Sequence, residues 1–271
     1  MRLDERFTRM PTRKMSAPGG EELASTGSSA ERSLRLLALL ANEGRALALA
    51  ELSVRLGLPK VTAHRLCTQL LDAGFLARDV DERCYAVGPA LRQLAFDTLN
   101  HGVVRGLRHE VLAALVTEVG ETCNFTTLDG SQVLYVDRVE AQWPLRLSLD
   151  VGSHVPLHCT ASGKLFLAEM APAARDAFIK HLPLTRMTRH TLCSARALKL
   201  ECEAITKAGY ACDREEFIAG LIAVAVPVRN AIGRTCAAVA VHAPAARLSL
   251  AKAQRKLPAL RAAAARLQAL L

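Results

Sequence analysis

The sequence of 271 residues has no pair of cysteines at Cys-x-x-Cys spacing, although it contains eight cysteines. Zinc ribbons, zinc fingers and thioredoxin-like redox sites are built on such pairs, so the spacing argues against these classes. Most of the cysteines stand inside apolar runs, where a free thiol packs as a small hydrophobic side chain. We therefore expect reduced, structural cysteines and no cofactor.

The sequence also lacks an uninterrupted apolar stretch of about 18 residues and the apolar segment of a signal peptide. A membrane-spanning helix and a secretory leader are therefore not expected. The hydrophobic content of 51% is enough to fill the cores of two ordinary domains. We expect a soluble, cytoplasmic protein that has no membrane partner.

The net charge of +9 is compatible with a nucleic-acid partner, but its location weakens that interpretation. Residues 1–90 carry 13 basic and 11 acidic side chains, whereas residues 171–271 carry 16 basic and 6 acidic ones. The excess of positive charge lies near the C-terminal end. Charge alone therefore does not identify the partner.

The first part of the chain changes character near residue 30. Residues 1–29 mix Arg, Pro, Gly and Ser without periodicity and are predicted to form a disordered leader. Apolar residues then recur at helical spacing, with Ser29 as the expected N-cap and Gly44 as the stop signal. An ordered domain is therefore predicted to begin with a helix.

Two more helices and a hairpin follow. The second helix closes on Gly57, and the third has Pro59 at its first position, where a missing N–H is harmless, and ends at Gly74. The polar turn at residues 79–83 then joins two short strands. Three helices and a hairpin predict a winged helix-turn-helix domain over residues 30–88.

The remaining chain is predicted to be α+β. A linker helix over residues 89–110 is expected to break or bend near Gly102 or Gly106. Residues 111–271 read as an antiparallel sheet with helices against it, and Asp129-Gly130 gives a hairpin signal. The expected elements are a strand over 145–152, a loop, a helix over 161–170, strands over 221–230 and 235–244, and a last helix over 248–271.

The third helix has an apolar stripe and a polar row. The stripe that can pack on the first two helices consists of Ala63, Leu66, Leu70 and Ala73. The polar row consists of Lys60, Thr62, His64, Arg65, Thr68 and Gln69. A solvated helix face would have the same pattern. The short preceding helix and the following hairpin, with Arg78 and Arg83, favour a helix that enters the major groove of double-stranded DNA.

Several segments in order resemble the IclR family of bacterial transcription regulators. They include "ERSLRLLALLANEG", "LAELSVRLGLPKVTAHRLCTQLLDAGFLARD", "GETCNFTTLDGSQVLYVDRVE" and "VGSHVPLHCTASGKLFLA". The resemblance covers nearly everything from about residue 30 onward. It implies an N-terminal winged helix, a linker helix and a C-terminal GAF-like domain that binds a small organic acid effector. It also implies homodimers or homotetramers on palindromic operators.

The segment "HCTASGKLFLAEM" begins a helix with small residues. These residues allow either a ligand anion at the free N–H groups or close packing of the helix on the sheet. The resemblance implies the first alternative, with the main chain of Ala161 and Ser162 holding an effector carboxylate. It also implies Asp213 as a polar pocket residue and an apolar wall of Leu147, Val155 and Leu221.

Three positions depart from the pattern of relatives that bind small oxo-acids. Ala223 stands where a cysteine can occur, and Ala240 and His242 stand where serines can occur. These departures favour a larger or more apolar acid, for example an aromatic one. If His242 were protonated when the acid binds, the affinity would rise towards pH 6.

A metal site and a nucleophilic cysteine are two alternatives to an effector-binding site. His154, His158 and Cys159 are close in sequence, but the residues between the histidines read as loop, and no nearby carboxylate completes the set. Cys159 or Cys123 with a histidine would need an orienting acid, and none is evident. We therefore expect no metal, no catalytic residues and no enzyme.

Two rivals stay open beside the ligand-responsive regulator. One is an enzyme that acts on a small organic acid and carries a DNA-binding head. The other is a DNA-binding protein with a purely oligomerising second domain. Repressor and activator are equally compatible with the sequence.

At least a dimer is expected without DNA, because two DNA-reading heads a helical turn apart require a two-fold axis. Leu34 and Leu37 of the first helix, and the linker helix from Pro89, offer apolar residues for such an interface.

Overall fold

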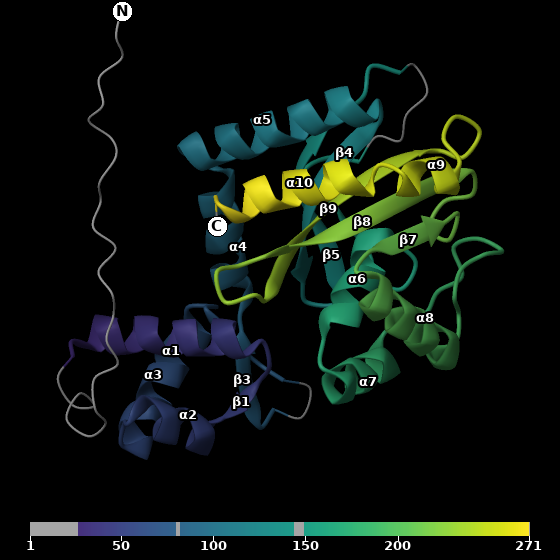
Figure 1. The fold of residues 1–271 in the computed structure, drawn as a ribbon. Helices are drawn as coiled ribbons and strands as arrows, with labels where there is room; N and C mark the ends of the chain where they lie inside the picture. The colour runs from purple at the N-terminus through teal and green to yellow at the C-terminus, as the bar shows by residue number, and fades with distance from the viewer. Residues whose placement is uncertain (1–26, 80–81, 144–148, 271) are drawn as a thin grey trace, which may run out of the picture. The chain divides into compact units, whose positions relative to one another are not determined.

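The chain of this computed structural model divides into two compact units, Met1–Gln93 and Leu94–Leu271. The structure describes residues 27–79, 82–143 and 149–270 (Figure 1). Most of the predicted leader, part of the predicted strand over 145–152 and the predicted pocket residue Leu147 lie outside the described residues. Within the described ranges, no helix has both the length and the apolarity needed to cross a membrane.

The N-terminal unit is a helix-turn-helix with a small sheet, as predicted. Its helices pack on a leucine-rich core, and its strands pair antiparallel in the order β1-β3-β2. The helices are α1 (Ser29–Glu43), α2 (Leu49–Leu56) and α3 (Lys60–Asp72). The strands are β1 (Leu47–Ala48), β2 (Leu76–Arg78) and β3 (Cys84–Val87). The sequence did not predict β1, which is too short to show a period.

Two helix starts differ from the prediction by one residue. Ser28, not Ser29, caps α1, because the Ser28 side chain accepts a hydrogen bond from Glu31 N at 3.2 Å. Pro59 is the N-cap of α3 rather than its first residue, and the helix begins at Lys60. The missing N–H of Pro59 costs no helical hydrogen bond at either position, N-cap or first helical residue.

The C-terminal unit contains an antiparallel sheet with the strand order β6-β5-β4-β9-β8-β7. Its strands are β4 (Thr122–Asp129), β5 (Gln132–Val139), β6 (His154–Pro156), β7 (Ala211–Arg214), β8 (Leu221–Arg229) and β9 (Thr235–Pro244). The hairpin at Asp129-Gly130 is confirmed by the pairing of Asp129 with Gln132. The loop predicted before the helix at 161 is wrong in part, because β6 pairs with β5.

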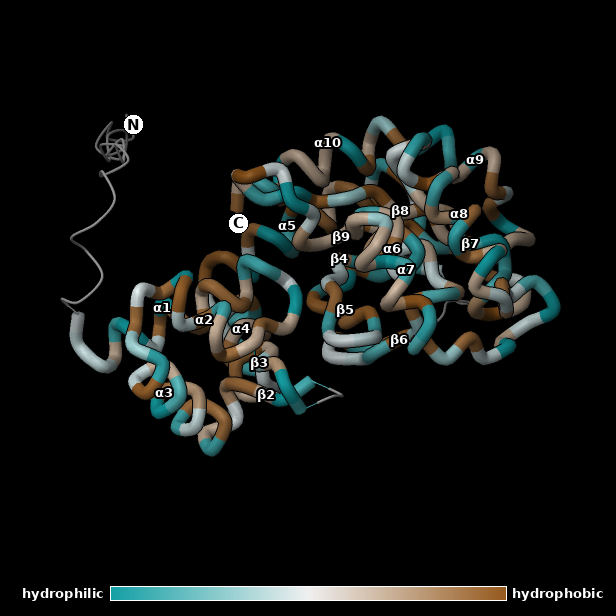
Figure 2. Tube along the Cα trace, turned by 90° about the horizontal axis from the view of Figure 1, so that it is seen from below, coloured by the Kyte–Doolittle hydropathy of each residue, from teal (hydrophilic) through white to brown (hydrophobic). Residues whose placement is uncertain are grey.

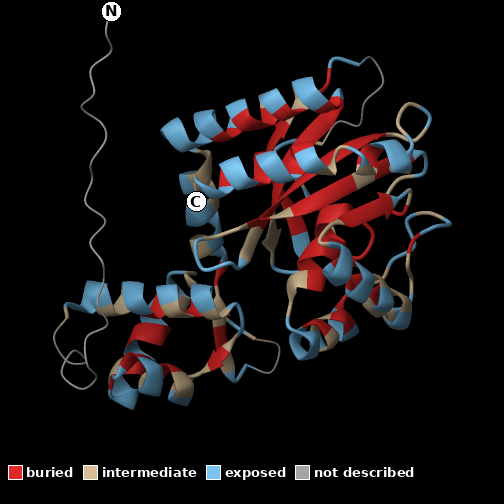
Figure 3. Cartoon of the chain, in the orientation of Figure 1, coloured by how far each residue is buried: buried red, intermediate tan, exposed pale blue. Residues whose placement is uncertain are grey.

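Helices cover both faces of this sheet (Figures 1 and 3). One face carries α5 (Gly102–Val119), α9 (Leu250–Gln254) and α10 (Leu257–Gln268). On the other face α6 (Ala161–Glu169) lies against the strands, with α7 (Pro172–His181) and α8 (Ala195–Ala208) packed beyond it. The single last helix predicted over 248–271 is wrong, because the chain leaves the helix after Gln254 and Pro258 stands at the start of α10.

The predicted linker helix ends at a break. Helix α4 (Pro89–Asn100) stops before His101, and Gly102 has a φ of 67°, which only glycine adopts at little cost. The bend predicted near Gly102 is therefore confirmed, whereas Gly106 lies inside α5.

Arg108 of α5 holds this break in place. Its guanidinium donates to the Leu99 carbonyl at 2.7 Å, to Asn100 Oδ1 at 2.9 Å and to Asp137 Oδ2 of β5 at 3.0 Å. Arg108 and Asp137 are both buried. The end of α4 is thereby fastened to one face of strand β5.

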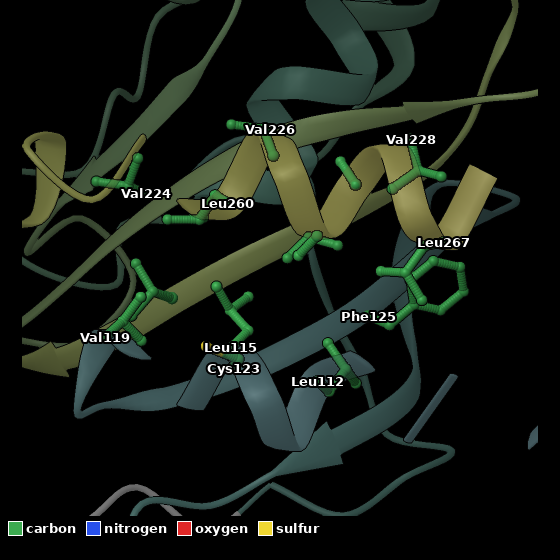
Figure 4. Close-up of a cluster of buried hydrophobic side chains, with 14 of the residues drawn as sticks. Leu112, Leu115, Val119, Cys123, Phe125, Val224, Val226, Val228, Leu260 and Leu267 are labelled. Atoms are coloured by element: carbon green, nitrogen blue, oxygen red, sulfur yellow. The ribbon is translucent and has the colours of Figure 1, made fainter. Parts of the chain in front are cut away.

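The two faces of the sheet differ in side-chain size. Val224, Val226 and Val228 of β8 point into the core beneath α5 and α10, where Figure 4 shows them among Leu112, Leu115 and Leu260. Because side chains alternate along a strand, Ala223 and Ala225 point towards α6. Strand β8 therefore presents valines to one side of the sheet and alanines to the other.

Candidate functional site

Helix α3 packs on the N-terminal unit through one side. Ala63, Leu66 and Cys67 are at most 1% exposed, and Leu70 is half-buried. Ala73 is exposed, so its place in the predicted apolar stripe is wrong: it lies after the last helical residue, where the helical period no longer sets its direction. Figure 2 shows hydrophobic and hydrophilic residues interleaved along this helix.

The predicted polar row of α3 is largely exposed. Thr62 is half-buried, and the exposed members are Lys60, His64, Arg65, Thr68 and Gln69. Thr68 Oγ1 donates back to the His64 carbonyl at 3.1 Å. Among the described residues, the side chains of Lys60, Arg65 and Gln69 have no hydrogen bond or ion pair. Their polar groups are therefore available to a partner molecule.

Two arginines near α2, Arg45 and Arg55, are already paired. Arg45 Nη1 lies 3.3 Å from Glu51 Oε2, and Arg55 Nη2 lies 3.2 Å from Glu51 Oε1. Arg55 also pairs with Glu43. These partners neutralise the arginines near α2, whereas the positive charges of α3 carry no such partner.

The two predicted wing arginines differ. Arg78 lies over the Tyr85 ring at 4.1 Å and donates to the Glu82 carbonyl at 3.1 Å, so it braces the hairpin. Arg83 is exposed at the turn, where its backbone N–H donates to Asp79 Oδ1 at 3.0 Å. Of the two, Arg83 presents the freer charge.

In the C-terminal unit a cavity lies between the start of α6 and the sheet. All predicted pocket residues that the structure describes line it, namely Val155, Ala161, Ser162, Asp213, Leu221, Ala223, Ala240 and His242. The sequence did not point to Asn124, Tyr135 or Phe217, which also line it. Asn124 had a usable signal, since it is a polar residue inside a β-rich run.

Small side chains create this cavity. Ala223 pairs across the sheet with His242, and Ala225 pairs with Ala240, so three of these four positions on β8 and β9 present only a methyl group. The volume is about 20 Å³, room for about one water molecule. An organic ligand would therefore need the lining side chains to move apart.

The first turn of α6 has two free donors. Thr160 Oγ1 accepts from Gly163 N at 3.2 Å and caps the helix. The N–H groups of Ala161 and Ser162 have no acceptor among the described residues. Because both residues line the cavity, these donors suit an anion there.

Gly163 has a different role from its two neighbours. A Cβ placed on it would lie 2.3 Å from the Leu157 carbonyl oxygen, so the helix packs directly on that backbone. Close packing is therefore confirmed at Gly163, whereas the free N–H groups of Ala161 and Ser162 leave the anion at this helix start a prediction.

A buried ion pair fastens α6 to the segment after β7. Lys164 is fully buried, and its Nζ donates to Glu216 Oε1 and, at 3.3 Å, to Glu201 Oε1. Glu216 N in turn donates to Asp213 Oδ1 at 2.7 Å. Lys164 thereby positions the residues from Asp213 to Phe217 along the cavity.

Burial raises the pKa of Asp213 from 3.8 to about 7, while the hydrogen bond from Glu216 N opposes the shift. Between these two values the unfolded chain has lost the proton and the folded protein keeps it. The stability contributed by this group is therefore present below about pH 4 and falls as the pH rises towards 7.

We expect the free energy of unfolding of the wild type to fall, relative to Asp213→Asn, as the pH rises from about 4 to about 7, because the amide does not titrate. Urea unfolding at pH 4.5, 6 and 7.5 measures this difference. A difference that stays constant with pH would contradict the raised pKa.

His242 is neutral in the free protein. Burial, with a smaller contribution from the charge of Arg138, lowers its pKa to about 3. Its Nδ1 lies 3.1 Å from Asn124 Nδ2, and its Nε2 has no partner among the described residues. The ring is therefore not protonated near pH 6 in the free protein, and a rise in affinity towards pH 6 would require the bound acid to raise this pKa.

The histidines weighed as metal ligands have other partners. His154 Nε2 lies 2.9 Å from Asp129 Oδ2, and His158 Nε2 donates to the Thr185 carbonyl at 2.8 Å. Across the described ranges, no group of three or more potential ligands is arranged to hold a metal ion.

The thiols weighed as nucleophiles are buried. Burial raises the pKa of Cys159 to about 12 and that of Cys123 further still. Both are therefore protonated at neutral pH, the less nucleophilic form of the group.

Comparison with known proteins gives matches over nearly the whole described chain. Residues 96–269 match the model described as "Bacterial transcriptional regulator IclR C-terminal", and residues 29–80 match "IclR helix-turn-helix domain". The chain is 41% identical over 239 residues to "Probable transcriptional regulator SauR" of Cupriavidus necator, which covers 88% of this chain and 95% of that protein.

Two further similarities agree with these matches. The chain is 29% identical over 244 residues to "Transcriptional repressor IclR" of Escherichia coli, covering 89% of each protein. It superposes on the crystal structure of the Thermotoga maritima IclR with a TM-score of 0.60 and 26% identity, covering 89% of this chain and 97% of that one.

Proposed function

Because the chain belongs to the IclR family and is a DNA-binding transcriptional regulator with a ligand-binding C-terminal domain, we propose that its effector is an organic acid held in the α6 cavity. The observation that carries this proposal is the pair of free N–H groups of Ala161 and Ser162, which start a buried helix and line a cavity with apolar walls. The helix dipole and two aligned donors stabilise a carboxylate without a paired cation.

The body of the acid lies against Val155 and Leu221 in this proposal. Leu147, which lies outside the described residues, stays a proposed member of the same wall by resemblance. Ala223 and Ala240 leave room above the sheet, which supports the expectation of an acid with an apolar body.

A panel of aliphatic and aromatic acids, each beside its amide, tests this proposal by thermal shift. An acid at a hundred times its dissociation constant should stabilise the fold by about 2.7 kcal/mol, whereas its amide should shift the melting temperature little. Ser162→Trp should fill the cavity and abolish the shift. Equal shifts from an acid and its amide would contradict the carboxylate, and an undiminished shift in Ser162→Trp would contradict the location.

The same panel separates the two rivals. Turnover of a candidate acid would favour an enzyme with a DNA-binding head. Failure of every acid to shift the melting temperature, with operator binding intact, would favour a purely oligomerising second domain.

We also propose that α3 enters the major groove, with Arg65 and Gln69 reading bases and Lys60 holding a phosphate. These side chains are exposed and have no partner among the described residues, which supports the assignment. Thr62, His64 and Thr68 flank them, and Arg78 and Arg83 belong to the hairpin that follows.

Arg65→Ala should lose about 1–3 kcal/mol of discrimination between operator and random DNA, because it removes a base contact. Lys60→Ala should weaken both DNAs alike and reduce the salt slope by about one unit. Affinities across a salt series measure both effects. Arg55→Ala is the matched control, since Arg55 pairs with Glu43 and Glu51. If Arg65→Ala bound both DNAs like the wild type, α3 would not lie in the groove.

The proposed domain limits are 30–88 for DNA binding, 89–110 for the linker and 111–271 for the effector domain.

We propose homodimers or homotetramers on a palindromic operator, supported by exposed apolar side chains at Leu34 and Val103, which are 66% and 77% exposed. Leu37, expected at this interface, is buried in its own core. Light scattering that found a 29.2 kDa monomer with full operator affinity would contradict this proposal.

A further inference from the structure

A row of buried polar side chains crosses three strands on the cavity side of the sheet. Arg138 of β5 lies 3.1 Å from Asn124 of β4, measured from Nη1 to Oδ1. Asn124 Nδ2 lies 3.1 Å from Nδ1 of His242 on β9. All three residues are at most 9% exposed, and Asn124 and His242 line the cavity.

The chemistry of this row fixes the direction of each hydrogen bond. A guanidinium only donates, so the atom of Asn124 that faces Arg138 is its oxygen. The Asn124 amide nitrogen therefore faces His242 and donates to Nδ1, which must carry a lone pair. In a neutral imidazole the proton then resides on Nε2.

The Nε2–H group is the open end of this row. It is buried and has no acceptor among the described residues. A buried donor without a partner is costly, and a ligand atom that accepts its hydrogen bond removes that cost. The cavity thus has two free N–H groups at α6 and a third donor on the sheet.

Asp213 restricts the acceptor that suits this donor. Asp213 and His242 lie in one cross-strand row with Ala223 between them. Above its pKa of about 7, Asp213 is ionised and its charge repels a second anionic group. A hydroxyl fits both residues, because it accepts from His242 Nε2–H and donates to the Asp213 carboxylate.

We propose, resting on the acid-binding function above, that the effector is a hydroxy acid whose hydroxyl lies between His242 and Asp213, with its carboxylate at α6. Arg138 and Asn124 are positioning residues that hold His242 in the Nε2–H form. The apolar spacer between the two groups lies over Ala223 and Ala240.

Matched pairs of acids test the effector class. Benzoate and 4-hydroxybenzoate, and propanoate and 3-hydroxypropanoate, are titrated into the full-length protein and followed by thermal shift. At least one hydroxy acid should bind about tenfold tighter than its unsubstituted partner. 4-Methoxybenzoate lacks the hydroxyl donor and terephthalate adds a second negative charge. Neither should show this advantage over benzoate.

His242→Phe should abolish the tenfold advantage, measured as the ratio of the affinities for the hydroxy acid and its unsubstituted partner in the same variant. An advantage that persists in His242→Phe would overturn the proposal. Acids that bind with no preference for the hydroxyl would also overturn it while leaving the acid-binding function intact. If no acid binds, both proposals fall.

The tautomer is tested without ligand by nitrogen NMR of protein labelled with ¹⁵N-histidine. The signals that disappear in His242→Phe should be those of a neutral ring with its proton on Nε2 at pH 7. Asn124→Asp, which accepts instead of donating, should move that proton to Nδ1 and remove the hydroxyl advantage although the ring is still present. A wild-type ring with its proton on Nδ1 would overturn the assignment.

Discussion

Lys164→Met is expected to lower the free energy of unfolding by about 3–5 kcal/mol, because it leaves Glu216 buried without its cation. Lys164 is fully buried and the Glu216 side chain is 4% exposed, so solvent does not screen the loss. Glu216 Oε2 already lacks a partner among the described residues, and the variant would also remove the lysine donor from Oε1. Urea unfolding at pH 7 measures the change.

Lys199→Met is the matched control for this prediction. Lys199 Nζ pairs with Asp176 at 3.0 Å, but the side chains are 32% and 44% exposed, so the variant should cost at most about 1 kcal/mol. Adding Glu216→Gln to Lys164→Met should recover part of the stability, since no buried charge is then left unpaired. Equal costs for the two methionine variants would show that the buried pair contributes little.

Gly163→Ala is expected to destabilise the protein by about 3 kcal/mol, near the upper end of the cost of overpacking. The new Cβ would lie 2.3 Å from the Leu157 carbonyl oxygen and 2.5 Å from its Cα, and backbone atoms cannot rotate away as a side chain can. Because Gly163 follows Ala161 and Ser162, the response to an acid should also weaken. Urea unfolding and the acid thermal shift measure these effects.

The control is Gly106→Ala, another glycine inside a helix. A Cβ at Gly106 meets nothing within 4 Å, so the variant should stabilise α5 by about 0.5–1 kcal/mol. If Gly163→Ala were tolerated as well as Gly106→Ala, α6 would not be packed on Leu157 as described.

Local signals predicted the elements that depend on neighbours in sequence. Gly44 and Gly57 end their helices in the left-handed conformation, with φ of 64° and 62°. The hairpin at Asp129-Gly130 follows from the same preference. Helical spacing placed most of α3 correctly and failed at Ala73, where the helix has already ended.

The site required information that no local pattern holds. Asn124 and His242 are 118 residues apart in sequence, and Lys164 and Glu216 are 52 apart. Their contacts exist because the strand order places β4 beside β9 and because α6 crosses the sheet. The pocket residues were found through a family resemblance, whereas their protonation states follow from burial that only the fold determines.

Strand β5 carries two neighbouring residues that face opposite sides of the sheet. Asp137 faces the side on which Arg108 holds the end of α4, and the next residue, Arg138, faces the cavity and holds Asn124. In the proposed effector site, substituting Ala223 or Ala240 should alter which molecule is accepted without touching either arginine. An engineer who wants to change the proposed ligand preference should therefore randomise the alanines and leave β5 unchanged, because Asp137 and Arg138 hold the end of α4 and the Asn124–His242 row on one strand.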